Sequence, residues 1–420
     1  MADFIPELLT LKEILFEKKS FQEAYFKTKL NERISNCENK RLKERISGCL
    51  RHYQSLSFEC LNALPVYDRN SEEFLLSLIA LYLLRYEKND ETDVKVSYHD
   101  SFVKMRMLGD ANKNFEALLS SSKNVFTIPD DVKDSPFVYN SMILETPEFL
   151  LKRWCKDFSA DKSGKIALSL HYKPSNYYYK TREDVSLVDY NLQPVNFDKG
   201  IVIYKAKKGM SSAQARELSL IQIDYIEAYA FSKIELPHIS PSILLNGPRN
   251  GSSFLLYSLN VNHLYQNKVV AAYQSLASFR SASDLEKKYQ LKGTSFLFAE
   301  SSLIKTYLPF DSFDFAVCYG KDAGIGMARR KIEVLPSLKE KDLAVASKSE
   351  YDQLLDSAEF IKKNGTLLFL SSALDKEEGS NVIKKFLSNR KDYALVDQEY
   401  LLPCDNDIDG GYYAILRRIK

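Results

Sequence analysis

The sequence contains 420 residues, of which 45% are hydrophobic and 27% are charged, and its formal net charge is +2. This length is too great for one hydrophobic core, and the composition excludes an intrinsically disordered chain. The near-neutral charge excludes a global field that would require nucleic acid as a partner. Basic residues outnumber acidic ones only in the segment 136–210, which indicates either a phosphate-facing surface or an ordinary solvated one.

The cysteines and the N-terminus are typical of a cytoplasmic protein. None of the six cysteines forms a Cys-x-x-Cys pair, so neither a zinc site nor a secreted disulfide framework is expected. The first residues lack the basic-then-apolar pattern of a signal peptide. The longest apolar run, 74–84, is shorter than the roughly 20 residues that span a bilayer. We therefore expect a soluble protein of the cytoplasm that binds no metal and no membrane.

The first 130 residues have the periodicity of helices. In the segment 41–53, Leu42, Ile46 and Leu50 share one face, while most of the basic residues lie off it. The segment 74–86 is apolar nearly all round, as expected of the central helix of a bundle. Another helical stretch begins at 114–119. We predict an all-α domain over 1–130.

The segment 136–208 predicts a small α+β subdomain. It follows a polar, proline-containing link at 121–145. A helix is expected to begin with Thr146 as its N-cap and Pro147 at its first position. After this helix, the segments 166–172 and 201–206 and the tyrosine patch at 177–179 are predicted to form short strands.

The segment 209–420 alternates apolar strands with helical stretches. Short apolar runs bounded by turn residues occupy 242–246, 268–273, 295–300, 313–320 and 365–372. A helix is expected between the last two runs, closed by Asn364 and Gly365. This alternation favours a parallel α/β sheet of Rossmann type, covered by helices on both faces.

Three stretches of the sequence resemble one enzyme family. The segment 146–154 (TPEFLLKRW) is similar to the Pro-x-Trp-Leu-x-x-x-Trp helix that opens the methyltransferase region of the Sun/RsmB family. The segment 313–334 aligns without a gap on that family's Asp-Ala-Pro-Cys-Ser-Gly-x-Gly-x-x-Arg-Arg-Lys stretch. The segment 409–414 (DGGYYA) resembles its closing Asp-Gly-Phe-Phe-x-Ala strand. The chain is thus identified as a divergent member of the Sun/RsmB-type 16S rRNA cytosine-C5 methyltransferases, although a generic helical domain fused to an unrelated Rossmann fold remains the alternative.

The resemblance implies a fold and a reaction. The fold is an all-α NusB-like bundle (1–130), a small α+β linking subdomain (136–208) and a Rossmann-like class I methyltransferase domain (209–420). The reaction is methyl transfer from S-adenosylmethionine (SAM) to C5 of a cytosine. In the family, one cysteine adds to C6 of the base and a second releases the product, because a thiolate is a soft nucleophile that ionises near neutral pH.

Both family cysteines are replaced in this sequence. Asp322 stands at the Pro-Cys position and Ser372 at the Thr-Cys position. A serine hydroxyl stays protonated at neutral pH, and a carboxylate is a poor nucleophile for conjugate addition. Cys318 lies four residues before Asp322 inside an apolar strand, which indicates a buried structural thiol. No family catalytic residue is therefore expected to be retained.

The family's cofactor loop is also altered. Its Cys-Ala-Ala-Pro-Gly-Gly-Lys-Thr stretch, which surrounds the methionine part of SAM at a strand-to-helix turn, corresponds to NGPRNGSS at 246–253. The lysine is lost, and Glu300 is the one strand-end acid of four that survives. The remaining pocket either binds an adenosine-like ligand in a rewired form or is a relic kept for folding. The resemblance assigns this degraded cofactor pocket to Asn246, Gly247, Gly251, Tyr273, Glu300 and Tyr319.

The retained features are basic or aromatic and indicate RNA binding. Arginine and lysine pair with phosphates, and tyrosine rings stack on bases. Solvated surface charge, with the tyrosines partly in the core, is the alternative. The candidate RNA contacts are Lys152, Arg153, Lys180, Arg182, Arg329, Arg330 and Lys331.

Three functions follow from these features. The first is a monomeric, catalytically impaired RNA-binding protein that associates with 16S rRNA. The second is a divergent but active SAM-dependent rRNA cytosine-C5 methyltransferase. The third is a NusB-like protein-interaction module.

Overall fold

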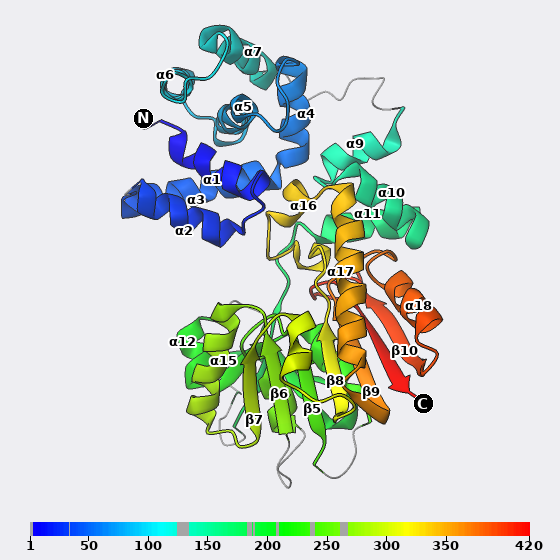
Figure 1. Cartoon of the computed structure of the whole chain (residues 1–420). Helices are drawn as coiled ribbons and strands as arrows, with labels where there is room; N and C mark the ends of the chain where they lie inside the picture. The colour runs from blue at the N-terminus through cyan, green and yellow to red at the C-terminus, as the bar shows by residue number, and fades with distance from the viewer. Residues whose placement is uncertain are drawn as a thin grey trace. The chain divides into compact units, whose positions relative to one another are not determined.

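The computed structural model describes residues 3–32, 34–123, 134–182, 187, 190–206, 210–235, 240–260 and 268–420. Part of the predicted polar link, 124–133, lies outside these ranges. The chain forms two compact units (Figure 1). The N-terminal unit contains 1–172 together with 328–339, and the C-terminal unit contains 173–327 and 340–420. The division into three domains at 1–130, 136–208 and 209–420 stays a prediction. No described helix is long and apolar enough to cross a membrane.

The N-terminal unit is all-helical in its described residues, as predicted. Its central helix, α5 (Glu72–Tyr82), continues into the π-helical turn η1 (Leu83–Glu87) and contacts α1, α3, α4, α6 and α7. Burial on all sides explains why the segment 74–86 is apolar nearly all round. The other helices are α1 (Ile5–Leu15), α2 (Phe21–Asn31), α3 (Asn36–Arg51), α4 (Tyr53–Ala63), α6 (Glu91–Lys104), α7 (Ala111–Lys123), α9 (Pro136–Ile143), α10 (Glu148–Asp157), α11 (Ala160–Ser169) and α16 (Val334–Ser337).

Two predictions in this unit are wrong. The segment 166–172 was expected to be a strand, but its first half belongs to α11. Ser163, Ile166 and Leu170 are buried at helical spacing, and this face outweighs the short alternating pattern. The start of α10 is also displaced by one residue. Pro147 is its N-cap, and the Thr146 hydroxyl instead donates to the Leu144 carbonyl at 2.7 Å.

The C-terminal unit contains a seven-stranded sheet in the order β10-β11-β9-β8-β5-β6-β7. β5 to β9 run parallel, and β10 and β11 are antiparallel additions at one edge, which confirms the Rossmann-like prediction. The strands are β5 (Ser242–Asn246), β6 (Lys268–Tyr273), β7 (Thr294–Phe298), β8 (Phe313–Tyr319), β9 (Ile361–Ser371), β10 (Tyr393–Leu401) and β11 (Gly411–Arg418).

Helices cover both faces of this sheet (Figure 1). α13 (Tyr225–Ser232), α14 (Ser253–Asn260) and α15 (Leu276–Tyr289) contribute to one core, and α17 (Glu340–Ala358) and α18 (Ser380–Asn389) contribute to the other. The prediction that Asn364 and Gly365 close a helix is wrong, because α17 ends at Ala358 and both residues lie inside β9. Asn364 has a φ of 64°, and the pairing of β8 with β9 shifts register between Phe313 and Phe315.

A second, antiparallel sheet has the order β2-β3-β1-β4. Its strands are β1 (Asn176–Lys180), β2 (Leu192–Asn196), β3 (Val202–Ala206) and β4 (Leu220–Ile223), and the short helix α12 (Ser212–Glu217) follows β3. Tyr177 and Tyr178 are both buried, in two different apolar clusters. These two rings therefore stabilise the sheet, and the expectation that the tyrosine patch stacks on RNA bases is wrong for them.

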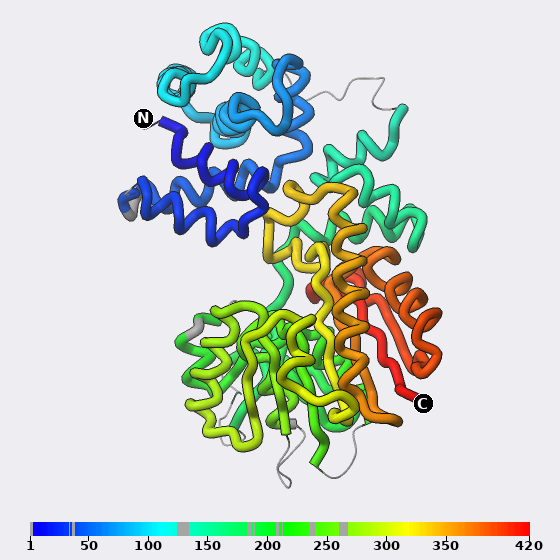
Figure 2. Tube along the Cα trace, in the orientation of Figure 1, coloured from blue at the N-terminus to red at the C-terminus, as the bar shows by residue number. Residues whose placement is uncertain are grey.

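A loop follows β8 and leads into the short 3-10 turn η5 (Ile325–Met327). Figure 2 traces the path of the main chain. Another 3-10 turn, η4 (Ser301–Thr306), follows β7, and a third, η3 (Asp198–Gly200), lies between β2 and β3. Because parallel strands end at the same edge of a sheet, the loops after β5, β6, β8 and β9 meet there. This edge is where ligands bind in open α/β sheets.

Candidate functional site

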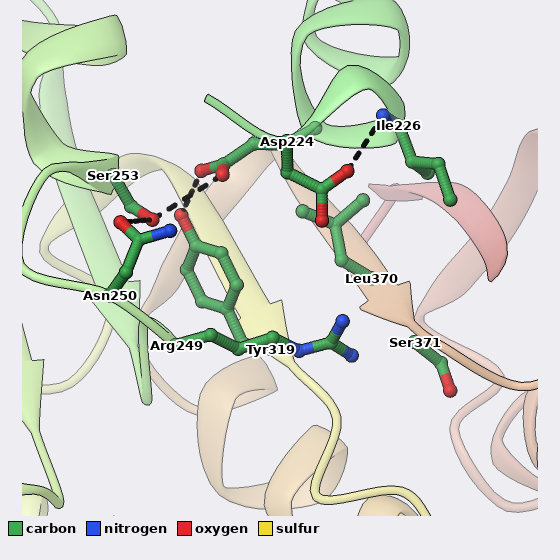
Figure 3. Close-up of a pocket in the computed structure, with 9 residues that line it drawn as sticks. Asp224, Ile226, Arg249, Asn250, Ser253, Tyr319, Leu370 and Ser371 are labelled. Atoms are coloured by element: carbon green, nitrogen blue, oxygen red, sulfur yellow. Dashed lines mark hydrogen bonds between the residues drawn. The ribbon is translucent and has the colours of Figure 1, made fainter. Parts of the chain in front are cut away.

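A small pocket lies at the carboxyl ends of β5, β8 and β9, beside the start of α13 (Figure 3). Its open volume, including the part continuous with solvent, is about 330 Å³. Charged and polar side chains dominate the lining, with only two aliphatic residues. The lining residues are Asp224, Ile226, Glu227, Arg249, Asn250, Ser253, Tyr319, Leu370 and Ser371.

The carboxylate of Asp322 is the hub of the hydrogen bonds beside this pocket. The backbone N–H of Ser372 donates to Oδ2 at 2.5 Å, and the Ser372 hydroxyl donates to Oδ1 at 2.5 Å. The N–H of Gly324 donates to Oδ1 at 2.8 Å, and Arg249 forms an ion pair with Oδ2. The Asp322 side chain is only 6% exposed. Its two oxygens are therefore occupied by fixed donors from three separate loops.

Ser371 links this hub to a second buried carboxyl group. Its hydroxyl lies 2.6 Å from Oε1 of Glu350 and 3.3 Å from Oδ2 of Asp322. Glu350 comes from α17 and is fully buried, and its Oε2 has no hydrogen-bond partner. Burial, together with the charges of Asp322 and Glu378, raises the pKa of Glu350 well above its usual value.

Two other buried acids beside the site, Glu227 and Glu378, also have raised pKa values. Burial, opposed by a hydrogen bond from Tyr319, raises the pKa of Glu227 to about 8. Burial also raises the pKa of Glu378, to about 9, and neighbouring Asp375 and Asp322 contribute. A buried carboxyl group without a full set of partners holds its proton because ionisation in a low-dielectric interior is unfavourable. Protonation of Glu227 and Glu378 removes the repulsion that two buried carboxylates would add to the site.

The six predicted cofactor residues lie mostly outside the lining of this pocket. Of the six, only Tyr319 lines it, and its ring is buried with the hydroxyl donating to Glu227. The amide of Asn246 donates to Ser301 at 2.9 Å and to Ser357 at 2.8 Å, so it is used within the protein. Glu300 is exposed before η4 and is not among the lining residues.

The other three cofactor candidates, Tyr273, Gly247 and Gly251, are closely packed against other protein atoms. The Tyr273 ring is fully buried at the end of β6. Gly247 has a φ of +77°, and a Cβ there would lie 2.6 Å from the Gln353 amide. A Cβ at Gly251 would lie 2.6 Å from the Ser281 side chain. The positive φ of Gly247 and the close approach of Ser281 and the Ser278 carbonyl to Gly251 disfavour a side chain at either position; whether the loop also binds an adenosine-like ligand stays a prediction.

The replaced cysteine positions do meet at the site, as the resemblance implies. Asp322 and Ser372 are hydrogen-bonded to each other. Cys318 is fully buried in β8, and burial raises the pKa of its thiol to about 12, which confirms the prediction of an inert structural thiol. No cluster of His, Cys, Asp and Glu within the described ranges could hold a metal ion.

The candidate RNA contacts are divided between the two units. Lys152, Arg153, Arg329, Arg330 and Lys331 belong to the N-terminal unit, and Lys180 and Arg182 belong to the C-terminal unit. Arg329 is only 9% exposed, and its Nε donates to the Tyr172 carbonyl at 2.6 Å. The expectation of a phosphate contact therefore does not fit Arg329. Lys152, Arg182 and Lys331 are exposed, and Arg153, Lys180 and Arg330 are partly buried; an RNA contact by any of these six stays a prediction.

The acidic and basic residues that dominate the pocket were not predicted from the sequence. Asp224 caps the N-terminus of α13, where its Oδ1 accepts from the Ile226 N–H at 2.9 Å. Glu227 lies one turn later, and Arg249 and Asn250 lie in the loop after β5. Arg249 was the one residue that the sequence could have indicated, because it places a charge in the loop 246–253 at a position that is uncharged in the family.

Comparisons with known proteins agree with this fold. Residues 265–416 match the profile of a family described as 16S rRNA methyltransferase RsmB/F. No curated protein sequence matches the chain. The crystal structure of PH0851 has a TM-score of 0.73 at 15% identity and covers 98% of this chain and 97% of that chain.

Two further solved structures are similar over about two thirds of this chain. A methyltransferase homologue from Pyrococcus horikoshii has a TM-score of 0.57 at 12% identity, covering 68% of this chain and 99% of that chain. NSun6 from Pyrococcus horikoshii, solved with SFG, has a TM-score of 0.50 at 13% identity, covering 65% of this chain and 98% of that chain. At these identities the likeness establishes the fold.

Proposed function

We propose that the chain binds rRNA without methylating it, starting from the match of residues 265–416 to the RsmB/F family of 16S rRNA methyltransferases. The observation that carries the proposal is that Asp322 and Ser372 stand at the two positions where the family has cysteines. Asp322 and Ser372 are bonded to each other and to neighbouring groups. Neither can add to C6 of a cytosine, because addition requires a free, soft nucleophile.

The residues at the edge of the sheet do not fit SAM, although the family resemblance supports this cofactor. A SAM site of the family type needs an open loop after the first strand and carboxylates at the strand ends. Here Arg249 projects from that loop onto Asp322. Buried tyrosine rings stand at two of the strand ends, at Tyr273 and Tyr319.

The first experiment measures methyl transfer. The purified full chain is incubated with labelled SAM and deproteinised 16S rRNA, with an active RsmB-type enzyme assayed in parallel. We expect no incorporation of label above the background without enzyme. Titration calorimetry with millimolar SAM is expected to show no heat of binding. Label on C5 of cytosine would overturn the proposal in favour of a divergent active methyltransferase.

RNA is the proposed partner because the fold belongs to rRNA-modifying enzymes and exposed basic residues are retained. We further propose that the target is 16S rRNA and that the chain acts as a monomer in the cytoplasm. Crosslinking to total RNA followed by sequencing is expected to recover rRNA. Recovery of no RNA would favour the alternative, a NusB-like protein-interaction module.

Lys331 allows a sharper test of the RNA surface. If this exposed side chain contacts a phosphate, Lys331→Ala weakens binding to every sequence and reduces the salt slope of the affinity by about 1. Lys287, an exposed lysine on α15, provides a matched control, and Lys287→Ala is expected to leave the slope unchanged. Equal slopes for both variants and the unmodified chain would remove Lys331 from the RNA surface.

A further inference from the structure

Arg249 is the one basic residue that lines the pocket, and acidic residues surround it. Figure 3 shows its guanidinium group extended across the pocket towards Ser371. It forms an ion pair with Asp322, and its side chain is 30% exposed. Burial alone would lower the pKa of Arg249, but Asp322 and Asp224 raise it above its usual value, with smaller contributions from other carboxyl groups.

No other cation balances this group of acids among the lining residues, since Arg249 is the one basic residue there. The Asp322 carboxylate accepts hydrogen bonds from two N–H groups and one hydroxyl, and it pairs with the Arg249 guanidinium. The fully buried Glu350 is bonded to Ser371, and its other oxygen has no hydrogen-bond partner among the described residues. Without the guanidinium, the pocket would hold uncompensated negative charge in a partly desolvated cavity, which is strongly unfavourable.

We infer that Arg249 is an internal ligand, a guanidinium that fills an acidic cation site which would otherwise bind a small organic cation. This inference rests on the proposed function in one respect, the absence of a cofactor from this site. It goes further in naming the chemical class that the site accepts. The loop after β5 supplies the cation itself, so the site is closed to external cations as long as Arg249 points at Asp322.

The test is chemical rescue by guanidinium in the full chain. Arg249→Ala removes the cation and leaves space for it, and we expect the melting temperature to fall by roughly 4 to 8 °C. Guanidinium chloride at up to 50 mM is expected to restore at least half of this fall in the variant. The same concentration of sodium chloride is expected to restore much less. The unmodified chain is expected to gain nothing from guanidinium, because its site is already filled.

Arg418 provides the matched control. It pairs with Asp311 at the other end of β11, away from the edge that holds the pocket, and its side chain is 18% exposed. Arg418→Ala is expected to lower the melting temperature without rescue by guanidinium beyond the effect of sodium chloride. Equal responses of the two variants, or no response of Arg249→Ala, would overturn the inference.

Two further variants keep the test decisive if Arg249→Ala does not fold. Arg249→Lys retains a cation and is expected to lose less stability and to show no guanidinium response. Arg249→Ala combined with Asp322→Asn removes both charges, and we expect it to be more stable than Arg249→Ala alone. A double variant that is less stable than the single one would contradict the inference. None of these measurements uses RNA or SAM, so their failure is distinguishable from failure of the proposed function.

Discussion

The Ser372 hydroxyl donates a hydrogen bond of 2.5 Å to Oδ1 of Asp322. These residues stand where the resembling family has its two cysteines, fifty positions apart in the chain. Through this bond, both side chains stabilise the loops in which they lie. The bond is a fixed contact between the loop after β8 and the residues that follow β9.

Asp322→Ala is expected to destabilise the chain by about 3 kcal/mol, because it leaves several donors and the Arg249 guanidinium without their acceptor. Chemical denaturation of the purified variant measures this change. Asp311→Ala is the control, since Asp311 is 61% exposed and exposed pairs contribute under about 1 kcal/mol. Similar losses for the two variants would show that Asp322 is not the hub of the site.

Glu227→Gln is expected to stabilise the chain increasingly as the pH rises from 5 to 8. The pKa of Glu227 is about 8 in the folded protein, against 4.5 for a glutamate exposed to water in the unfolded chain. Between these values the folded state holds a proton that the unfolded state has lost. Stability therefore falls with rising pH, by roughly 1 kcal/mol per pH unit, and glutamine, which does not titrate, removes this fall.

The measurement for Glu227 is the melting temperature of the variant and of the unmodified chain at pH 5, 6, 7 and 8. Glu217→Gln is the matched control, because Glu217 is exposed, and its difference from the unmodified chain is expected to be independent of pH. A constant difference for Glu227→Gln would mean that this acid is ionised in the folded state.

The strands of the parallel sheet could be predicted closely from the sequence. β5 and β6 begin and end at the predicted residues, 242–246 and 268–273. Strands buried on both faces leave continuous apolar runs with clear boundaries. The short amphipathic α11 was mistaken for a strand because a segment of its length fits either periodicity.

The site could be predicted only in part. The positions of Asp322 and Ser372 were found through the family resemblance, and the structure brings them together. The roles of Glu227 and Arg249 could not be found, because their partners lie 92 and 73 residues away in sequence. A single sequence carries no signal for such a pairing, since it depends on how separate loops converge at one edge of the sheet.

Gly326→Ala is expected to destabilise the chain by about 3 kcal/mol or more. A Cβ at this position would lie 2.0 Å from the Gly410 carbonyl oxygen and 2.7 Å from that of Ser372. Both neighbours are backbone atoms that cannot change rotamer, so the loop itself must move. Gly164→Ala in α11 is the control, because no atom lies within 4 Å of the new Cβ, and it should gain about 0.5–1 kcal/mol. Denaturation of both variants checks the pair, and a neutral Gly326→Ala would show that the loop after β8 is not held against Gly410.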